Sequence, residues 1–172
     1  GYDPTSVLEM RPDFRGMEFD SATTVAHRRR LLATAQAIPG VESAARVNSM
    51  LFGTNMADLR VPGIDSVARF GRFNFQLTTA DYFKVMRIPL LRGRGFTEAE
   101  STGNPPVVIV TASTAKRLWP NDEALGRHLE LLGQREWHTV VGVVDHSPLA
   151  RRQHDHMAAV GRLQEFGIHD EI

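Results

Sequence analysis

Histidines gather towards the end of the chain, in a pattern that could bind a metal ion. His154-Asp155-His156 follows His146, and His169-Asp170 stands close to the terminus. Neutral imidazoles and carboxylates are good ligands for zinc and similar ions. However, His154 and His156 lack the four-residue spacing that places two ligands on one face of a helix. We therefore expect an exposed polar helix and assign no metal ligand, and metal binding by His146, His154 and His156 stays open as the alternative.

Hydroxyl and carboxyl groups are the next candidates for chemistry. Nucleophilic catalysis needs a Ser or Thr beside a base and an oriented acid. No serine stands in a Gly-x-Ser-x-Gly elbow, and Ser113 is better explained as a helix cap. The pairs Asp122-Glu123 and Glu98 with Glu100 fall in expected loops or caps, where solvated carboxylates are normal. We predict no enzyme activity, no catalytic residue and no cofactor; the serines considered are Ser49, Ser66, Ser101 and Ser113.

Arginines and one tryptophan complete the candidates. Arg92-Gly93-Arg94-Gly95-Phe96 invites comparison with phosphate-binding loops, but the Gly-Lys-Ser/Thr and Gly-x-Gly-x-x-Gly patterns are missing. The glycines are expected to allow positive φ in a tight connection. Arg92 and Arg94 are predicted to pair with carboxylates, either within the domain, which we favour, or on a partner. Arg28-Arg29-Arg30 is interpreted as a solvated helix face, and Trp119 as a core residue rather than a docking aromatic.

Charge and composition exclude further classes. Lys plus Arg and Asp plus Glu number 20 each in 172 residues, so the electrostatic argument for nucleic-acid binding is missing. Cysteine is absent, which excludes disulfides and thiolate sites without fixing the redox compartment. No window approaches the roughly 18 to 20 apolar residues that span a bilayer. Gly1–Pro4 does not resemble a natural start, so we expect an excised, soluble piece of a longer protein.

The first fifty residues predict a strand, a helix and a second strand. Val7–Arg11 alternates weakly between apolar and polar residues. A helix is predicted next, capped by Asp20 or Ser21 and ending near residue 37, before the Pro39-Gly40 pair. Val41–Val47 predicts the second strand. Together these elements form a β-α-β unit.

Residues 50–145 predict a second, mixed α/β region. Arg69–Leu77 alternates so that Phe73, Phe75 and Leu77 share one face, which is typical of a half-buried strand. Val107–Val110 is a continuous apolar run, typical of a strand covered on both faces. The other elements expected are helices at Ala80–Met86 and Ala115–Trp119, an extended turn at Ile88–Leu91, a hairpin near residues 129–133 and a strand at Thr139–Val144. Met50–Pro62 predicts no readable element.

Several segments occur in an order that resembles a known family. They are DYFKVMRIPLLRGRGF at 81–96, VVIV at 107–110, AKRLWP at 115–120, GR at 126–127 and VVGVV at 140–144. GYDP at 1–4 and IPGVESA at 38–44 fit the same pattern. Together they resemble the MacB-like periplasmic core domain of ABC transporter permeases, especially large permeases without a fused ATPase. The resemblance covers about residues 1–145.

The resemblance implies a two-lobed α+β fold, situated between the first two transmembrane helices of a permease. Residues 1–49 would begin a lobe like the porter subdomains of efflux pumps, and residues 50–145 would form the lobe inserted into it. Residues 146–172 depart from the family and are predicted to be a divergent helical tail, which in part returns to the first lobe. Its helix is expected at Ala150–Phe166, because Met157, Val160, Leu163 and Phe166 form an apolar stripe.

By resemblance, the domain is expected on the periplasmic side of the inner membrane, where it couples movement of transmembrane helices to rearrangement outside, a mechanotransmission role in transport such as efflux. Its implied partners are the transmembrane helices of the same permease, a separate ATPase subunit and a periplasmic partner protein. The short tail raises the further hypothesis of a homodimer. The alternatives are a free-standing periplasmic ligand- or metal-binding protein and, less favoured, a small hydrolase.

Overall fold

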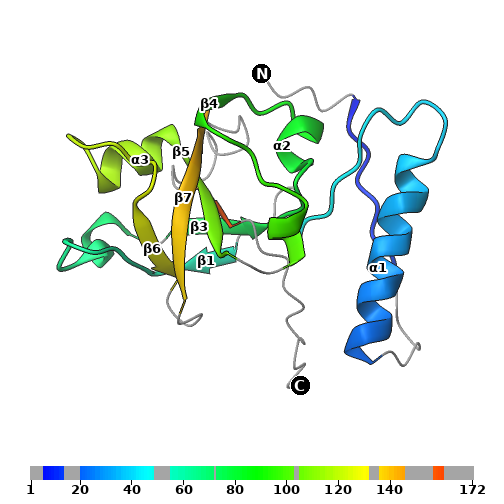
Figure 1. Cartoon of the computed structure of the whole chain (residues 1–172), viewed down its shortest axis with the longest axis horizontal. Helices are drawn as coiled ribbons and strands as arrows, with labels where there is room; N and C mark the ends of the chain where they lie inside the picture. Colours follow the sequence, from blue (N-terminus) through cyan, green and yellow to red (C-terminus); the bar gives the residue numbers. More distant parts are fainter. Residues whose placement is uncertain are drawn as a thin grey trace.

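The computed structural model of the chain describes residues 6–13, 20–48, 55–71, 73–102, 105–131, 136–145 and 157–160. The fold is mixed α+β, which confirms the expected class (Figure 1). The helices are α1 (Ser21–Gln36), α2 (Tyr82–Val85) and α3 (Ala112–Leu118), with short 3-10 turns η2 (Val67–Phe70) and η3 (Ala99–Thr102). The strands are β1 (Asn55–Ala57), β2 (Leu59–Arg60), β3 (Phe73–Leu77), β4 (Leu90–Gly93), β5 (Val107–Thr111), β6 (His128–Leu131), β7 (Trp137–Val144) and β8 (Met157–Val160).

The eight strands that the structure describes belong to one hydrogen-bonded sheet with the order β1-β3-β8-β5-β7-β6-β2, in which β4 also pairs with β7. The long strand β7 pairs with β5 along one edge. Its other edge is shared by two strands in series, β6 beside its first residues and β4 beside its last. β1 and β2 stand at opposite ends of this strand order, but only Asp58 separates them in the sequence. The two ends of the sheet therefore lie close together, and the sheet curves around its own core.

Buried apolar side chains cover both faces of the sheet. Val108 and Val110 of β5 belong to a larger cluster with α3, whereas Val107 and Ile109 point into a second cluster with α2. A strand buried on both faces reads as a continuous apolar run, so the prediction for Val107–Val110 is confirmed. The predicted face of β3 is also confirmed, because Phe73, Phe75 and Leu77 all pack in the larger cluster. We call the second group, formed by Tyr82, Met86, Ile88, Phe96, Val107, Ile109 and Val144, the α2 cluster.

Two glycines let β4 approach β7 closely. Gly93 and Gly142 are register partners in this antiparallel pair. A Cβ on Gly142 would collide with the carbonyl oxygen of Arg94, and one on Gly93 with that of Val141. Gly93 also has a φ of +75°, as the sequence predicted for this connection, whereas Gly95 lies in open space without a positive φ.

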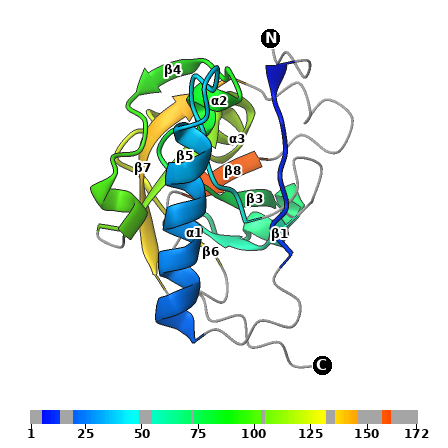
Figure 2. The same cartoon turned by 90° about the vertical axis from the view of Figure 1, so that its right-hand side faces the viewer.

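Helix α1 stands at one end of the molecule, away from the sheet, with α2 between them (Figure 1); the turned view shows it in front of the sheet (Figure 2). Its bounds agree with the prediction, and Asp20 is its N-cap: the carboxylate accepts a hydrogen bond of 2.7 Å from the backbone N–H of Thr23. No side chain described in α1 is buried. The helix therefore contributes little to the core.

The two strands predicted beside α1 are wrong. Residues 7–13 and 41–46 form no β-ladder, and Val47 makes only an isolated bridge with Thr78. Val7, Ala45 and Val47 pack against the α2 cluster, but burial does not alternate along either segment, since Leu8 and Met10 are exposed and residues 43–47 are all partly buried. A strand also needs a partner to receive its backbone hydrogen bonds, and the described residues supply none beyond the bridge at Val47.

Other local predictions are corrected as well. The helix expected at Ala150–Phe166 is wrong at residues 157–160, which form β8 between β3 and β5, because pairing on both edges overrides a local periodicity. The turn expected at Ile88–Leu91 overlaps β4, and β1 and β2 formed where no element was predicted. Thr111 rather than Ser113 caps α3, since its hydroxyl accepts the N–H of Thr114. The division at residues 49 and 145 stays a prediction.

Candidate functional site at the junction of helix α1 and the sheet

The chain that leaves α1 meets the sheet at one short double-stranded contact, which we call the junction: residues 46–48 beside residues 77–79. The N–H of Asn48 donates to the carbonyl oxygen of Leu77 at 3.0 Å, and the N–H of Thr79 donates to that of Arg46 at 3.0 Å. These two bonds flank the bridge between Val47 and Thr78. The junction thus extends the end of β3 by one antiparallel pair.

Two side chains complete the hydrogen bonding of the junction. The amide oxygen of Asn48 accepts the N–H of Leu77 at 2.8 Å. The hydroxyl of Thr79 accepts the N–H of Arg46 at 2.9 Å. Each side chain satisfies a backbone donor on the opposite segment, so both act as clasps across the junction. Sequence reading missed both, because an Asn at the end of one expected strand and a Thr after another carry no distinctive motif.

Apolar contacts beneath the junction hold it against helix α2. Val7, Ala45 and Val47 are partly buried against the α2 cluster, in which Met86 and Tyr82 are themselves buried. The hydroxyl of Tyr82 donates to the side-chain oxygen of Gln76 at 2.6 Å, which fixes α2 to β3. Tyr82 and Met86 both face the core from α2. The sheet and α2 thus form a stable base on which the α1 segment rests.

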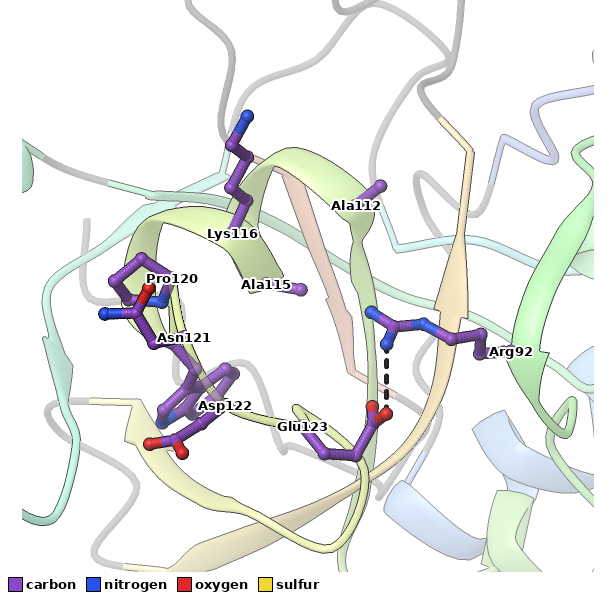
Figure 3. Close-up of a pocket in the computed structure, with 9 residues that line it drawn as sticks. Arg92, Ala112, Ala115, Lys116, Pro120, Asn121, Asp122 and Glu123 are labelled. Carbon is purple, nitrogen blue, oxygen red and sulfur yellow. Dashed lines mark hydrogen bonds and ion pairs between the residues drawn. The ribbon is translucent and has the colours of Figure 1, made fainter.

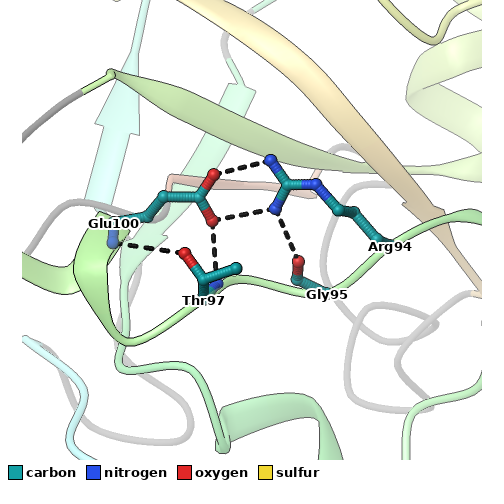
Figure 4. A network of polar contacts seen from close by, with 4 residues as sticks. All are labelled: Arg94, Gly95, Thr97 and Glu100. Atoms are coloured by element: carbon teal, nitrogen blue, oxygen red, sulfur yellow. Dashed lines mark hydrogen bonds and ion pairs between the residues drawn. The ribbon is translucent and has the colours of Figure 1, made fainter.

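A second polar contact closes the loop that follows β4 (Figure 4). The guanidinium of Arg94 donates to both carboxylate oxygens of Glu100, at 2.6 and 2.9 Å, and Glu100 also accepts the N–H of Thr97 at 2.8 Å. The hydrogen bonds from Arg94 lower the pKa of Glu100 to about 2, against the opposing effect of burial. Glu100 is 5% exposed, so the expectation of a solvated carboxylate is wrong, while the pairing predicted for Arg94 is confirmed.

A shallow groove of about 440 Å³ lies along α3 and the turn after it. Arg92 and Glu123 face each other across it at 3.0 Å (Figure 3), which confirms the pairing predicted for Arg92. Trp119 lines the groove and is buried, as predicted for a core residue. Asp122 and Glu123 are exposed, also as predicted, and Asp122 pairs with Arg127 at 3.1 Å. The charges of the groove largely satisfy one another.

The residues first considered for catalysis or metal binding lie partly in the cap of α3 and partly outside the described residues. The hydroxyl of Ser113 lies 3.0 Å from that of Thr111, which also donates to the hydroxyl of Thr114, so these groups belong to the cap of α3. His146, His154, His156, His169 and Asp170 lie outside the described residues, as does Ser49. Within the described part of the chain, no group of three His, Asp or Glu side chains is placed to hold a metal ion. Arg29 and Arg30 are exposed, as expected.

No helix in the described ranges is long and apolar enough to cross a membrane. No curated protein is significantly similar in sequence to the chain. Two solved structures share its fold. One is the periplasmic region of MacB from Actinobacillus actinomycetemcomitans, with a TM-score of 0.55 and 19% identity over 76% of this chain. The other is the extracellular domain of the noncanonic ABC-type transporter YknZ from Gram-positive bacteria, with a TM-score of 0.55 and 16% identity over 76% of this chain.

The chain covers 52% of the MacB region and 59% of the YknZ domain. At these identities the likeness establishes the fold, and the fold alone does not assign a function. The sequence itself matches the model of one family, described as MacB-like periplasmic core domain, over residues 3–166. This range includes nearly all the segments on which the resemblance was based. The chain therefore belongs to the family of MacB-like periplasmic core domains.

Proposed function

We propose that the chain is the periplasmic part of an ABC transporter permease and transmits movement from transmembrane helices to the outside. In this proposal a separate ATPase subunit drives the helices, and the domain carries the movement without acting on a substrate chemically. The observation that carries the proposal is the junction: a helix with no buried described side chain is connected to a densely packed sheet by one short antiparallel contact.

Transmission of movement needs two bodies that keep their own shape and a connection that can change. The sheet qualifies as a rigid body because its strands β5 and β7 are buried on both faces. Helix α1 keeps its shape through its own backbone hydrogen bonds and the Asp20 cap. Few contacts join the two bodies, so a change at the junction would reorient α1 without disturbing the core. The family match, described as MacB-like periplasmic core domain, supports a part of a transporter rather than an enzyme.

The test is a distance measurement across the junction in the full permease with its ATPase, in lipid bilayers. Spin labels would be attached at Arg29→Cys on α1 and Lys116→Cys on α3, which are both exposed positions. Cysteine is absent from these 172 residues, so the labels are unique within them once any cysteine elsewhere is replaced. We expect the distance distribution to change between the nucleotide-free and the ATP-bound state.

The control pair is Asp65→Cys with Lys116→Cys, because both of these exposed residues belong to the sheet region. This pair should give the same distribution in every nucleotide state. An α1 pair that also keeps one distribution throughout would contradict the proposal. A change in both pairs would show that the sheet deforms, and it would contradict the rigid-body form of the proposal.

A further inference from the structure

Two adjacent threonines at the junction have opposite hydrogen-bonding states. The hydroxyl of Thr79 accepts the backbone N–H of Arg46 at 2.9 Å, from the segment that leads out of α1. Thr78 is 0% exposed, and its hydroxyl makes no hydrogen bond with any residue that the structure describes. Both belong to the same strand end, and both lie opposite residues 46–48.

These states act on the junction in opposite directions. A hydrogen bond across the contact stabilises the closed arrangement, so Thr79 favours closing. A hydroxyl that is buried without a partner has lost its hydrogen bonds to water, so Thr78 disfavours closing. If residues 46–48 move away, the hydroxyl of Thr78 regains water and that of Thr79 loses the N–H of Arg46. The two hydroxyls thus partly offset each other, and such an offset narrows the free-energy difference between the closed and the open junction.

We infer that Thr78 and Thr79 form a conformational balance that sets how often the junction opens. Thr79 and Asn48 hold residues 46–48 closed, and Thr78 keeps that closure from becoming permanent. This inference deepens the coupling function proposed above and rests on it for its biological purpose. The opening itself is a property of the chain and can be measured without a permease.

Apolar contacts also stabilise the closed junction, and their free energy is lost when the junction opens. Val7, Ala45 and Val47 bury part of their surface against the α2 cluster. All three are small or medium-sized and only partly buried, so their combined apolar contact is modest. In contrast, opening at β5 would expose a strand whose five residues are all buried, and opening at β7 would expose its buried last residues, Gly142 to Val144. Opening is therefore expected to be local, within residues 46–48 and 77–79.

The experiment is amide hydrogen exchange on the 172-residue chain, read at four backbone N–H groups that close the junction: Arg46, Asn48, Leu77 and Thr79. The N–H groups of Thr139 and Val140, which bond to Pro106 and Arg127, report the core. In the unsubstituted chain the junction amides should exchange faster than the core amides. Thr78→Val removes the unpaired hydroxyl at nearly constant shape and should slow junction exchange roughly tenfold.

Thr79→Val is the matched variant, since it makes the same change one residue later. It removes the acceptor for Arg46 and should speed junction exchange roughly fivefold, with the core amides unchanged. Should Thr79→Val fail to fold, Asn48→Ala takes its place and should also speed exchange of the junction amides. Asn48→Asp keeps an acceptor for the N–H of Leu77 and should leave the exchange rate of the unsubstituted chain unchanged. Slower exchange in Thr78→Val with faster exchange in Thr79→Val supports the balance.

Three results would overturn the inference: faster junction exchange in Thr78→Val, equal shifts of junction and core amides, or junction amides that exchange only as slowly as the core. These results are independent of the spin-label measurement. A junction that opens in the isolated chain, with no nucleotide-dependent distance change in the permease, would sustain the balance and reject the coupling function. The reverse combination would sustain the coupling function and reject the balance.

Discussion

Helix α1 and the sheet differ in what holds them in place. In the sheet, Leu129 and Ile109 are 0% exposed and pack in two apolar clusters. In and after α1, Leu31 is 40% and Ile38 is 47% exposed. The sheet owes its structure to burial, whereas α1 owes its structure to local backbone bonds and a cap. Many buried contacts thus fix the geometry of the sheet, whereas a few contacts fix the position of α1.

This difference identifies where sequence changes should matter. Substitutions in the sheet are expected to alter the free energy of unfolding of the whole domain. Substitutions in α1 are expected to alter local order and the position of the helix with little global effect. Four pairs of variants test this contrast, beginning with the largest expected effect.

Gly142→Ala should cause the largest loss of stability. The new Cβ would meet the carbonyl oxygen of Arg94, and also Ile109 Cγ1 at 3.2 Å, and backbone cannot yield as a flexible side chain can. We expect the free energy of unfolding to fall by at least about 4 kcal/mol, or the protein not to fold. Gly95→Ala is the control, because its Cβ would meet nothing within 4 Å. Urea denaturation gives the free energy of unfolding of both variants. Similar values would show that β4 and β7 do not need this close approach.

Truncation of one leucine side chain to alanine in each region tests the contrast directly. Leu129→Ala leaves a cavity in a fully buried site and should cost about 3 kcal/mol. Leu31→Ala removes a side chain that is 40% exposed, and alanine is a good helix former, so the cost should stay below about 1 kcal/mol. Thermal and urea unfolding give both values. Equal losses would mean that α1 contributes to the core as much as the sheet does.

The Arg94–Glu100 contact should give a smaller, pH-dependent effect. The pKa of Glu100 is lowered to about 2 in the folded chain, from an ordinary value of 4.5. A lowered pKa means that the carboxylate stabilises the fold above about pH 4.5, and that this contribution is lost as pH falls towards 2. Glu100→Gln should therefore reduce stability by about 2 kcal/mol near neutral pH.

The difference between Glu100→Gln and the unsubstituted chain should shrink as pH falls through this window. Glu98→Gln is the matched control, because it makes the same chemical change two residues away at an exposed position. Urea midpoints measured from about pH 7 down to about pH 2 would show the trend. A difference that is independent of pH would contradict the assigned ion pair.

Asp20→Ala should have the smallest global effect. The variant loses the hydrogen bond that the carboxylate of Asp20 accepts from the N–H of Thr23. We expect faster amide exchange at Thr23 and Thr24 and a small loss of helical circular dichroism, with an unchanged urea midpoint for the sheet. Asp20→Ser, which retains a capping oxygen, is the control. A shift of the sheet midpoint in Asp20→Ala would show that α1 and the sheet unfold as one unit.

Sequence reading worked where one physical effect dominated. The apolar run Val107–Val110 could be read because burial on both faces leaves a single pattern, and α1 could be bounded because Asp20 and the Pro39-Gly40 pair act locally. The ordered segments at 81–144 then sufficed to name the family, which the match over residues 3–166 confirms. The carboxylate pairing expected of Arg92 and Arg94 is also found, with Glu123 and Glu100.

Reading failed where long-range pairing decided the structure. Residues 157–160 have a helix-like spacing, but the fold gives them two strand neighbours distant in sequence. Val41–Arg46 has strand-like alternation, but no neighbouring strand pairs with it in the described structure. The clasps at Asn48 and Thr79 could not be found either, since each depends on a backbone N–H contributed by a segment about 30 residues away.

The place of β8 also constrains how the sheet assembles. It pairs with β3, whose residues precede it by about 80 positions, and it separates β3 from β5. Contacts between residues so distant in sequence require a large loop to close before any pairing energy is gained, which slows folding. During synthesis, β3 and β5 each keep one unpaired edge until the ribosome has released the chain up to Val160. Among the strands that the structure describes, the latest in the chain is thus needed to complete the middle of the sheet, and refolding should show a slow phase that a chain truncated before Met157 lacks.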